Sequence, residues 1–164
     1  MSELDYAIKL YNLATEEWSQ GRAIKNPLPS DSDIKAVEDT LSFIFPPSFR
    51  RFLELCPYYG GLQPRAATYP LSIIWDNRIY HEESEDGFLP QFLVLFMGAH
   101  DGDCECFDSR LRDKNGEVPI VFWEYYEMTE DDTIDLQARY ANFLEYLKFI
   151  TDLKLTRPKL PRPK

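Results

Sequence analysis

The feature that most constrains the fold is a change of hydrophobic pattern about halfway along the chain. Apolar residues recur at helical spacing up to residue 56, whereas residues 92–97 form one continuous apolar run. These six residues match the length of a strand that is covered on both faces, and they fall far short of a membrane span. The pattern therefore predicts helices first and a buried sheet second.

Three helices are predicted ahead of the sheet. The first begins after Ser2, a good N-cap residue, and stops near Gly21. The second has Ser30 or Ser32 as its cap, and the third starts at Pro46-Pro47 because proline is tolerated in the first helical turn. Their inward positions are Leu4, Ala7, Ile8, Tyr11, Ala14, Trp18, Ile34, Val37, Leu41, Phe49, Phe52, Leu53 and Cys56. Over residues 71–83 a helix and a twisted pair of strands both fit, and we favour the helix.

Three strands and a closing helix are predicted after residue 88. The strands cover residues 92–97, 104–109 and 118–127, with turns at Asp101-Gly102-Asp103 and Lys114-Asn115-Gly116. Turns this short join antiparallel strands, and Asn-Gly is the strongest short hairpin signal. A long amphipathic helix is expected after the acidic break at residues 129–132. Its inward face would hold Leu136, Tyr140, Phe143, Leu144, Leu147 and Ile150.

These elements predict an α+β fold class, with a central antiparallel sheet flanked by helices and a long C-terminal helix. The length of 164 residues suits one domain, which we place at residues 1–155. Residues 156–164 are basic and rich in proline, so we expect a disordered tail there.

Net charge narrows the class of partner. The chain has 28 acidic residues against 18 lysines and arginines, and five of these cations lie in the last eleven residues. The body up to residue 153 therefore carries a net charge of −15. Such a body repels nucleic acid and anionic membranes and favours encounter with a basic protein. Acidity that serves solubility alone is the equally weighted alternative.

The cysteines indicate the redox state of the compartment in which the protein is found. Their number is odd, and Cys56, Cys104 and Cys106 form no Cys-x-x-Cys pair, which favours a reducing environment over a disulfide framework. The N-terminal residues show no secretory signal. We therefore expect a cytoplasmic protein.

No motif with recognisable catalytic or metal-binding chemistry is found. Residues 101–112 superficially resemble a calcium loop, but Cys106 and Arg112 occupy positions that require glycine and glutamate, so a hairpin turn is favoured. His100, Cys104 and Cys106 lack a fourth zinc ligand at a supporting spacing. His81 and His100 lie in no nucleophile motif. The sequence predicts no cofactor, no metal and no enzymatic activity.

Aromatic residues alternate with acids where the third strand is expected to end. The stretch Glu124 to Asp135 holds six acids, and Trp123, Tyr125 and Tyr126 lie at its start. Large rings beside carboxylates are typical of protein-binding hot spots. The predicted partner-binding residues are Asp101, Asp103, Trp123, Glu124 and Glu127, with Trp123 as the anchor. The alternative is that these rings face the core, because alternate strand positions must point inward.

The order of several short motifs resembles the SUKH superfamily of Smi/Knr-type proteins. The matching stretches are Ile34–Leu41, Phe45–Leu53, Gly60-Gly61, Gly98–Asp108 and Val118–Val121, which together span about residues 30–150. Two positions depart from the usual pattern. Phe45 replaces a leucine, and Pro57-Tyr58-Tyr59 stands where an asparagine is common.

The resemblance implies an α+β fold and a binding function rather than catalysis. The superfamily includes a fungal regulator of cell-wall assembly, but most of its members are bacterial immunity proteins that block toxins, prominently nucleases. We therefore expect an immunity protein that binds a basic toxin, with an intracellular scaffold or regulator as the alternative and an undetected enzyme as a third. The motif residues are mainly structural in the family, so partner contacts do not transfer from them. The oligomeric state stays open between a monomer and a weak dimer.

Charge reversal at two of the four acids in the predicted partner-binding set should slow association with the partner at low salt. The reason is that attraction between opposite charges raises the association rate before contact. Stopped-flow measurement of that rate checks the prediction, and an unchanged rate would contradict it.

Overall fold

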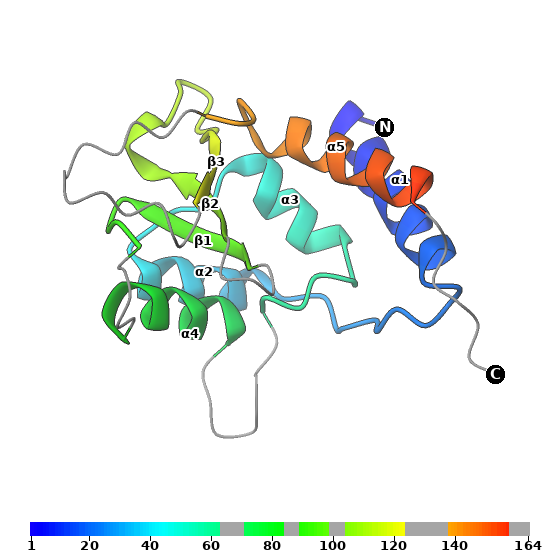
Figure 1. Cartoon of the computed structure of the whole chain (residues 1–164). Coiled ribbons are helices and arrows are strands. Elements are labelled where there is room, and N and C mark those ends of the chain that lie inside the picture. The colour runs from blue at the N-terminus through cyan, green and yellow to red at the C-terminus, as the bar shows by residue number, and fades with distance from the viewer. Residues whose placement is uncertain (63–70, 84–88, 99–103, 124–137, 158–164) are drawn as a thin grey trace.

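In a computed structural model, the structure describes residues 1–62, 71–83, 89–98, 104–123 and 138–157 (Figure 1). The helices are α1 (Glu3–Trp18), α2 (Asp31–Leu41), α3 (Pro47–Leu55), α4 (Ser72–Arg78) and α5 (Phe143–Thr156). A π-helical segment, Ile79–Glu83, continues α4, and a 3-10 turn covers Ser109–Leu111. The strands are β1 (Leu93–Gly98), β2 (Cys104–Asp108) and β3 (Ile120–Trp123).

The three strands form one antiparallel sheet in the order β1-β2-β3. Leu95 pairs with Cys106, which in turn pairs with Val121. One face of the sheet packs on the main core, and the other on a smaller apolar cluster around Leu93, Leu95 and Trp123. The predicted α+β class, the antiparallel sheet and the strand buried on both faces are therefore confirmed.

Helix α3 lies at the centre of the main core. Its Phe49 is fully buried, and its ring contacts aromatic rings from several other parts of the chain. The rings with centroids within about 6 Å are those of Phe45, Phe52, Tyr59, Phe96, Phe107 and Phe143. Edge-to-face and offset contacts of this kind add to the stabilisation that burial alone provides. The predicted inward face of α3 is confirmed.

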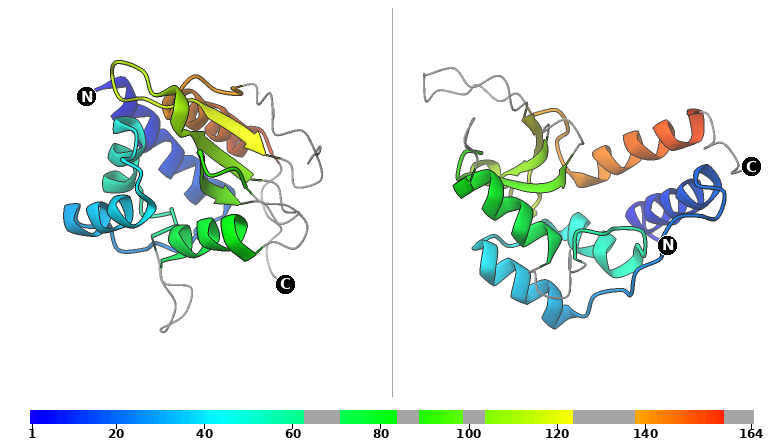
Figure 2. Two further views of the ribbon diagram at one scale, coloured as in Figure 1. Left: turned by 90° about the vertical axis from the view of Figure 1, so that its left-hand side faces the viewer. Right: turned by 60° about the horizontal axis from the view of Figure 1, so that its bottom comes forward.

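Helices α1 and α5 lie side by side, and α3 lies between this pair and α2 (Figure 2). The pair runs in parallel, because Lys148 contacts Glu3 and Lys154, farther along, contacts Trp18. Helix α1 begins at its predicted N-cap, where the Ser2 side chain accepts a hydrogen bond from Asp5 N–H. In α2, Ser30 and Asp33 form a full capping box.

Two carboxylates, one within α2 and one far along the chain, hold α3 in place. Glu38 is buried; it accepts a hydrogen bond from Phe45 N–H and pairs with Arg50 at 2.9 Å. Glu117 accepts from the backbone and the hydroxyl of Ser48, and so caps the N-terminus of α3, which lacks a cap of its own. The motif residue Glu38 thus serves the fold.

The outer edge of β1 is covered by a side chain from α4. Asn77 is 3% exposed; its amide donates to Leu95 C=O, and its oxygen accepts from Leu95 N–H. The same amide group also donates to Ile73 C=O within the helix. One asparagine thus stands in for a neighbouring strand at an edge that would otherwise expose unpaired backbone groups.

The last helix starts later than predicted. Tyr140 is not helical but forms an isolated antiparallel bridge with Ile120, and α5 begins at Phe143 with Asn142 as its N-cap. The bridge replaces the predicted helical turn because it pairs the N–H and C=O of Ile120 at the outer edge of β3. The helix over residues 71–83 is confirmed. In the described ranges, no helix has the length and apolar character needed to cross a membrane.

Replacing Asn77 with alanine should lower the free energy of unfolding by about 2–4 kcal/mol, because Leu95 would keep a buried N–H and C=O without partners. Chemical denaturation checks this value. Arg78→Ala, one residue along and exposed, is the matched control and should cost about 1 kcal/mol at most. Equal losses in the two variants would contradict the role assigned to Asn77.

Candidate binding groove

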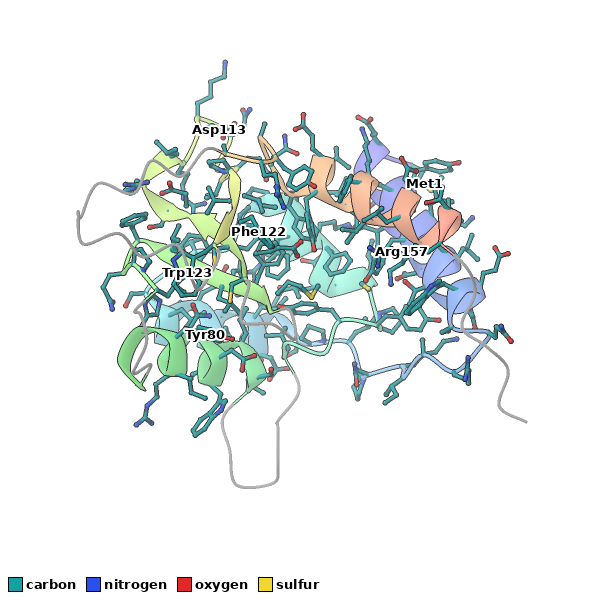
Figure 3. The ribbon with its side chains drawn as sticks, in the orientation of Figure 1. Met1, Tyr80, Asp113, Phe122, Trp123 and Arg157 are labelled. Atoms are coloured by element: carbon teal, nitrogen blue, oxygen red, sulfur yellow. The ribbon has the colours of Figure 1, made fainter. Side chains whose placement is uncertain are left out.

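A groove of about 750 Å³ separates the α1–α5 pair from α4 and β1. It is lined by Tyr11, Trp18, Tyr58, Tyr59, Gly60, Gly61, Ser72, Ile73, Asp76, Ile79, Tyr80, Leu95, Phe96, Met97, Tyr146, Ile150, Leu153, Lys154 and Arg157. Figure 3 shows Tyr80 on the α4 side and Arg157 at the end of α5. The volume falls within the range of sites that bind ligands.

Tyrosines form much of the groove, and three of them, Tyr11, Tyr59 and Tyr146, are buried. Tyr59 is buried and donates its hydroxyl to Phe96 C=O at 2.7 Å, and burial raises its pKa far above the usual range. Burial also raises the pKa of Tyr11 to about 12. Both side chains are therefore neutral at physiological pH, and they offer apolar faces rather than charges.

The two glycines in the motif at the groove have different roles. A Cβ on Gly61 would overlap the ring of Tyr59, whereas a Cβ on Gly60 would meet nothing within 4 Å. Gly61 also accepts a hydrogen bond from Ile73 N–H at the start of α4. Close approach of the backbone to an aromatic ring, and not turn geometry, therefore explains the second glycine.

Two cations lie on the α5 wall of the groove. The ammonium of Lys154 lies 4.9 Å from the ring centroid of Trp18 and 5.2 Å from that of Tyr11, which are cation–π contacts. Burial lowers the pKa of Lys154, and the neighbouring Arg157 acts in the same direction, whereas the nearby Cys56 thiol acts in the opposite one. Within the described ranges, neither cation has a carboxylate partner. The α5 wall therefore presents positive charge that the protein itself leaves uncompensated.

The opposite wall carries an acid. Asp76 of α4 accepts a hydrogen bond from Ser72 at 2.9 Å. Its negative charge adds to the burial that raises the pKa of Tyr59. The groove is thus polarised, with a carboxylate on the α4 side and two cations on the α5 side.

A buried acid lies behind the groove. The hydroxyl of Tyr146 donates to the carboxylate of Glu105 on β2, and burial raises the pKa of that carboxyl. The hydrogen bond from Tyr146 and the charge of Arg139 act in the opposite direction and favour the charged form. This pair ties α5 to the sheet and so fixes the groove wall that α5 supplies.

The structure places one of the five predicted partner-binding residues. Trp123 is 2% exposed and packs on Tyr80, with ring centroids 6.3 Å apart, so its described role is in the smaller apolar cluster. Asp101, Asp103, Glu124 and Glu127 lie outside the described residues. The acidic surface they were predicted to form therefore remains a prediction.

Sequence reasoning missed the groove. Tyr11 and Trp18 were correctly placed on the inward face of the first helix, but the space in front of them was not foreseen. The available signal was the replacement of the family's asparagine by Tyr58 and Tyr59, which puts two rings beside the glycine pair.

A family model described as the SMI1/KNR4 family (SUKH-1) matches residues 28–148. No curated protein shows significant similarity to the chain. The family match takes in α2, α3, α4, the sheet and the first part of α5. Helix α1 and the last part of α5, which together form one wall of the groove, lie outside the matched residues.

Gly61→Ala should lower the free energy of unfolding by about 1–3 kcal/mol, because the new methyl group overlaps a buried ring. Gly60→Ala is the matched control and should change it by about 0.5 kcal/mol or less. Thermal or chemical denaturation of both variants checks the difference. Equal effects at the two positions would contradict the close contact between Gly61 and Tyr59.

Proposed function

Because the chain belongs to the SMI1/KNR4 family (SUKH-1), we propose that it is a non-catalytic protein-binding domain that neutralises a cognate bacterial toxin by direct contact. Immunity proteins of this kind are the main group within the SUKH superfamily. The family membership is the observation that carries the proposal, and the groove and the charge of the chain support it.

The groove has the composition of a protein-binding site. Hot spots in protein interfaces favour tryptophan and tyrosine in partly enclosed pockets, with a few polar groups that set orientation. Trp18, Tyr58 and Tyr80 supply such rings, and Asp76 and Lys154 supply polar groups on opposite walls. We propose that the groove is the surface that holds the toxin.

The reactivity of the cysteines fits binding better than catalysis. Burial raises the pKa of the Cys56 thiol to about 11, and it raises that of Cys106 well above the usual range. A thiol becomes an effective nucleophile only as the thiolate, so both are inert at neutral pH. Their role is therefore packing, in the two apolar clusters of the fold.

The proposed partner is a basic protein, such as a nuclease toxin, that the chain meets in the cytoplasm. The net charge of −10 attracts such a partner at a distance and speeds the encounter. A nuclease surrounds its cleft with lysine and arginine, which an acidic inhibitor complements. Neither nucleic acid nor membrane is expected as a partner.

Co-expression tests the proposal. We expect a tagged chain to capture one basic protein from the source organism at low salt and to release it at high salt. Expressed alone, that protein should be toxic, and co-expression of the chain should restore growth. Trp18→Ala combined with Tyr58→Ala should weaken the rescue, whereas the control Leu13→Ala, on the exposed face of α1, should not.

Two other outcomes would contradict either the proposed function or the proposed binding surface. The tagged chain could instead capture endogenous proteins that are harmless when expressed alone and whose binding does not depend on salt concentration. That result would favour a scaffold or regulator. Full rescue by the variant with both groove substitutions would support the toxin as the partner. It would also show that the groove is not the surface that binds the toxin.

A further inference from the structure

We propose that the groove recognises a segment of the partner in which an aspartate or glutamate side chain lies among apolar residues, with its carboxylate bound by Lys154. This inference rests on the proposed function only in taking the occupant to be a protein segment.

The first argument is the unusual state of Lys154. Among the lysines that the structure describes, Lys9, Lys25, Lys35, Lys114 and Lys148 are exposed, and Lys154 alone is partly buried. Lys25, Lys35 and Lys148 have carboxylate partners, at 2.6–3.1 Å. Lys154 has two aromatic rings and the buried Cys56 thiol as neighbours, and no carboxylate partner in the described ranges. An ammonium withdrawn from water is costly unless a charge of opposite sign compensates it, and a ligand carboxylate would supply that charge.

The second argument is the surroundings of this ammonium. Arg157 lies one turn farther along the same wall, while Ile150, Leu153 and Trp18 provide apolar surface beside the two cations. A basic side chain entering here would face two like charges. An acidic side chain would meet two donors, and its apolar neighbours would cover the adjacent rings.

The lining also indicates where the acid sits in the segment. It extends from Lys154 to Ile150 on one side and to Arg157 on the other. A chain lying along this wall therefore has room on both sides of the ammonium, so the carboxylate belongs to a side chain within the segment and not to its C-terminus. The groove volume of about 750 Å³ accommodates several side chains.

The third argument concerns specificity. Most residues of this wall lie outside the stretch that matches the family model, namely Tyr11, Trp18, Ile150, Leu153, Lys154 and Arg157, whereas Tyr146 lies inside it. Most of the wall, including both of its cations, therefore belongs to segments that the family model does not cover. A partner that must be told apart from those of other family members would be recognised there.

A local preference for an acid is compatible with a basic partner. The net charge of the chain acts at long range and is screened over about 8–10 Å in physiological salt. The contact with Lys154 acts at hydrogen-bond distance, within a partly enclosed site. Overall attraction and local recognition can therefore favour opposite signs.

Panning of a random peptide display library tests the proposal without the natural partner. The targets are the full chain, Lys154→Gln, and the control Lys148→Gln on the exposed side of the same helix. We expect the chain and the control to select peptides with Asp or Glu flanked by Phe, Trp or Leu. Lys154→Gln should lose the selection for the acid. The negative net charge of the target repels acidic peptides in general. Enrichment of acidic peptides would therefore require a local site that binds the carboxylate.

A synthetic pair then gives the magnitude. The best selected peptide, blocked at both ends, should bind at least about tenfold more tightly by calorimetry than its Glu→Gln or Asp→Asn counterpart, as expected for a hydrogen bond between charged groups. Lys154→Gln should abolish that ratio. A Gln peptide with a free C-terminus tests the other source of a carboxylate, and its equally tight binding would overturn the assignment to a side chain.

Selection of basic peptides, selection without acids, no selection at all, or an acid preference that survives Lys154→Gln would each overturn the proposal. These outcomes are separable from the toxin experiment. Rescue from a toxin without selection of acids would reject this inference alone. Selection of acids without any toxin would reject the immunity function alone.

Discussion

The structure depends on the burial of one aromatic ring, that of Phe49. This ring lies at the centre of a cluster whose members come from α3, β1, β2, α5 and the segment after α3. Each of these elements is too short to be stable alone, and each buries its apolar face by packing on the same ring or its neighbours. The capping of α3 by Glu117 and the pairing of Glu38 with Arg50 hold the helix that carries Phe49 in place.

The groove follows from the same cluster. Tyr59 packs on Phe49, and its hydroxyl is fixed on Phe96, so the floor of the groove is part of the core. Phe143 packs on Phe49 at the start of α5, and this contact sets the position of the helix that carries Lys154 three turns later. The proposed binding surface thus rests directly on the close-packed core, and such support limits the entropy lost on binding.

Local signals made much of the fold predictable. Ser2 marked the start of α1, and the choice between Ser30 and Ser32 placed the start of α2 to within two residues. The apolar run at 92–97 marked a buried strand, and Phe49, Phe52 and Leu53 marked the inner face of α3. What failed or was missed depends on contacts between distant segments. Tyr140 leaves the helical pattern to pair with Ile120, and Asn77 covers a strand that follows it in sequence. The groove is lined by residues from α1, α4, α5, β1 and a glycine pair, so no single stretch of the sequence could predict it. The order of the motifs correctly indicated the family. The acidic partner-binding surface of the chain stays a prediction.

We propose that the groove holds the partner, and hydroxyl-radical footprinting of the side chains, with and without the captured partner, shows which surface the partner covers. We expect oxidation of Trp18, Tyr58 and Tyr80 to fall on binding, while the buried Trp123 serves as an unreactive internal reference. Unchanged oxidation of these three groove residues, with protection confined to Tyr125 and Tyr126 in the acidic stretch, would contradict the claim and favour the surface predicted from the sequence.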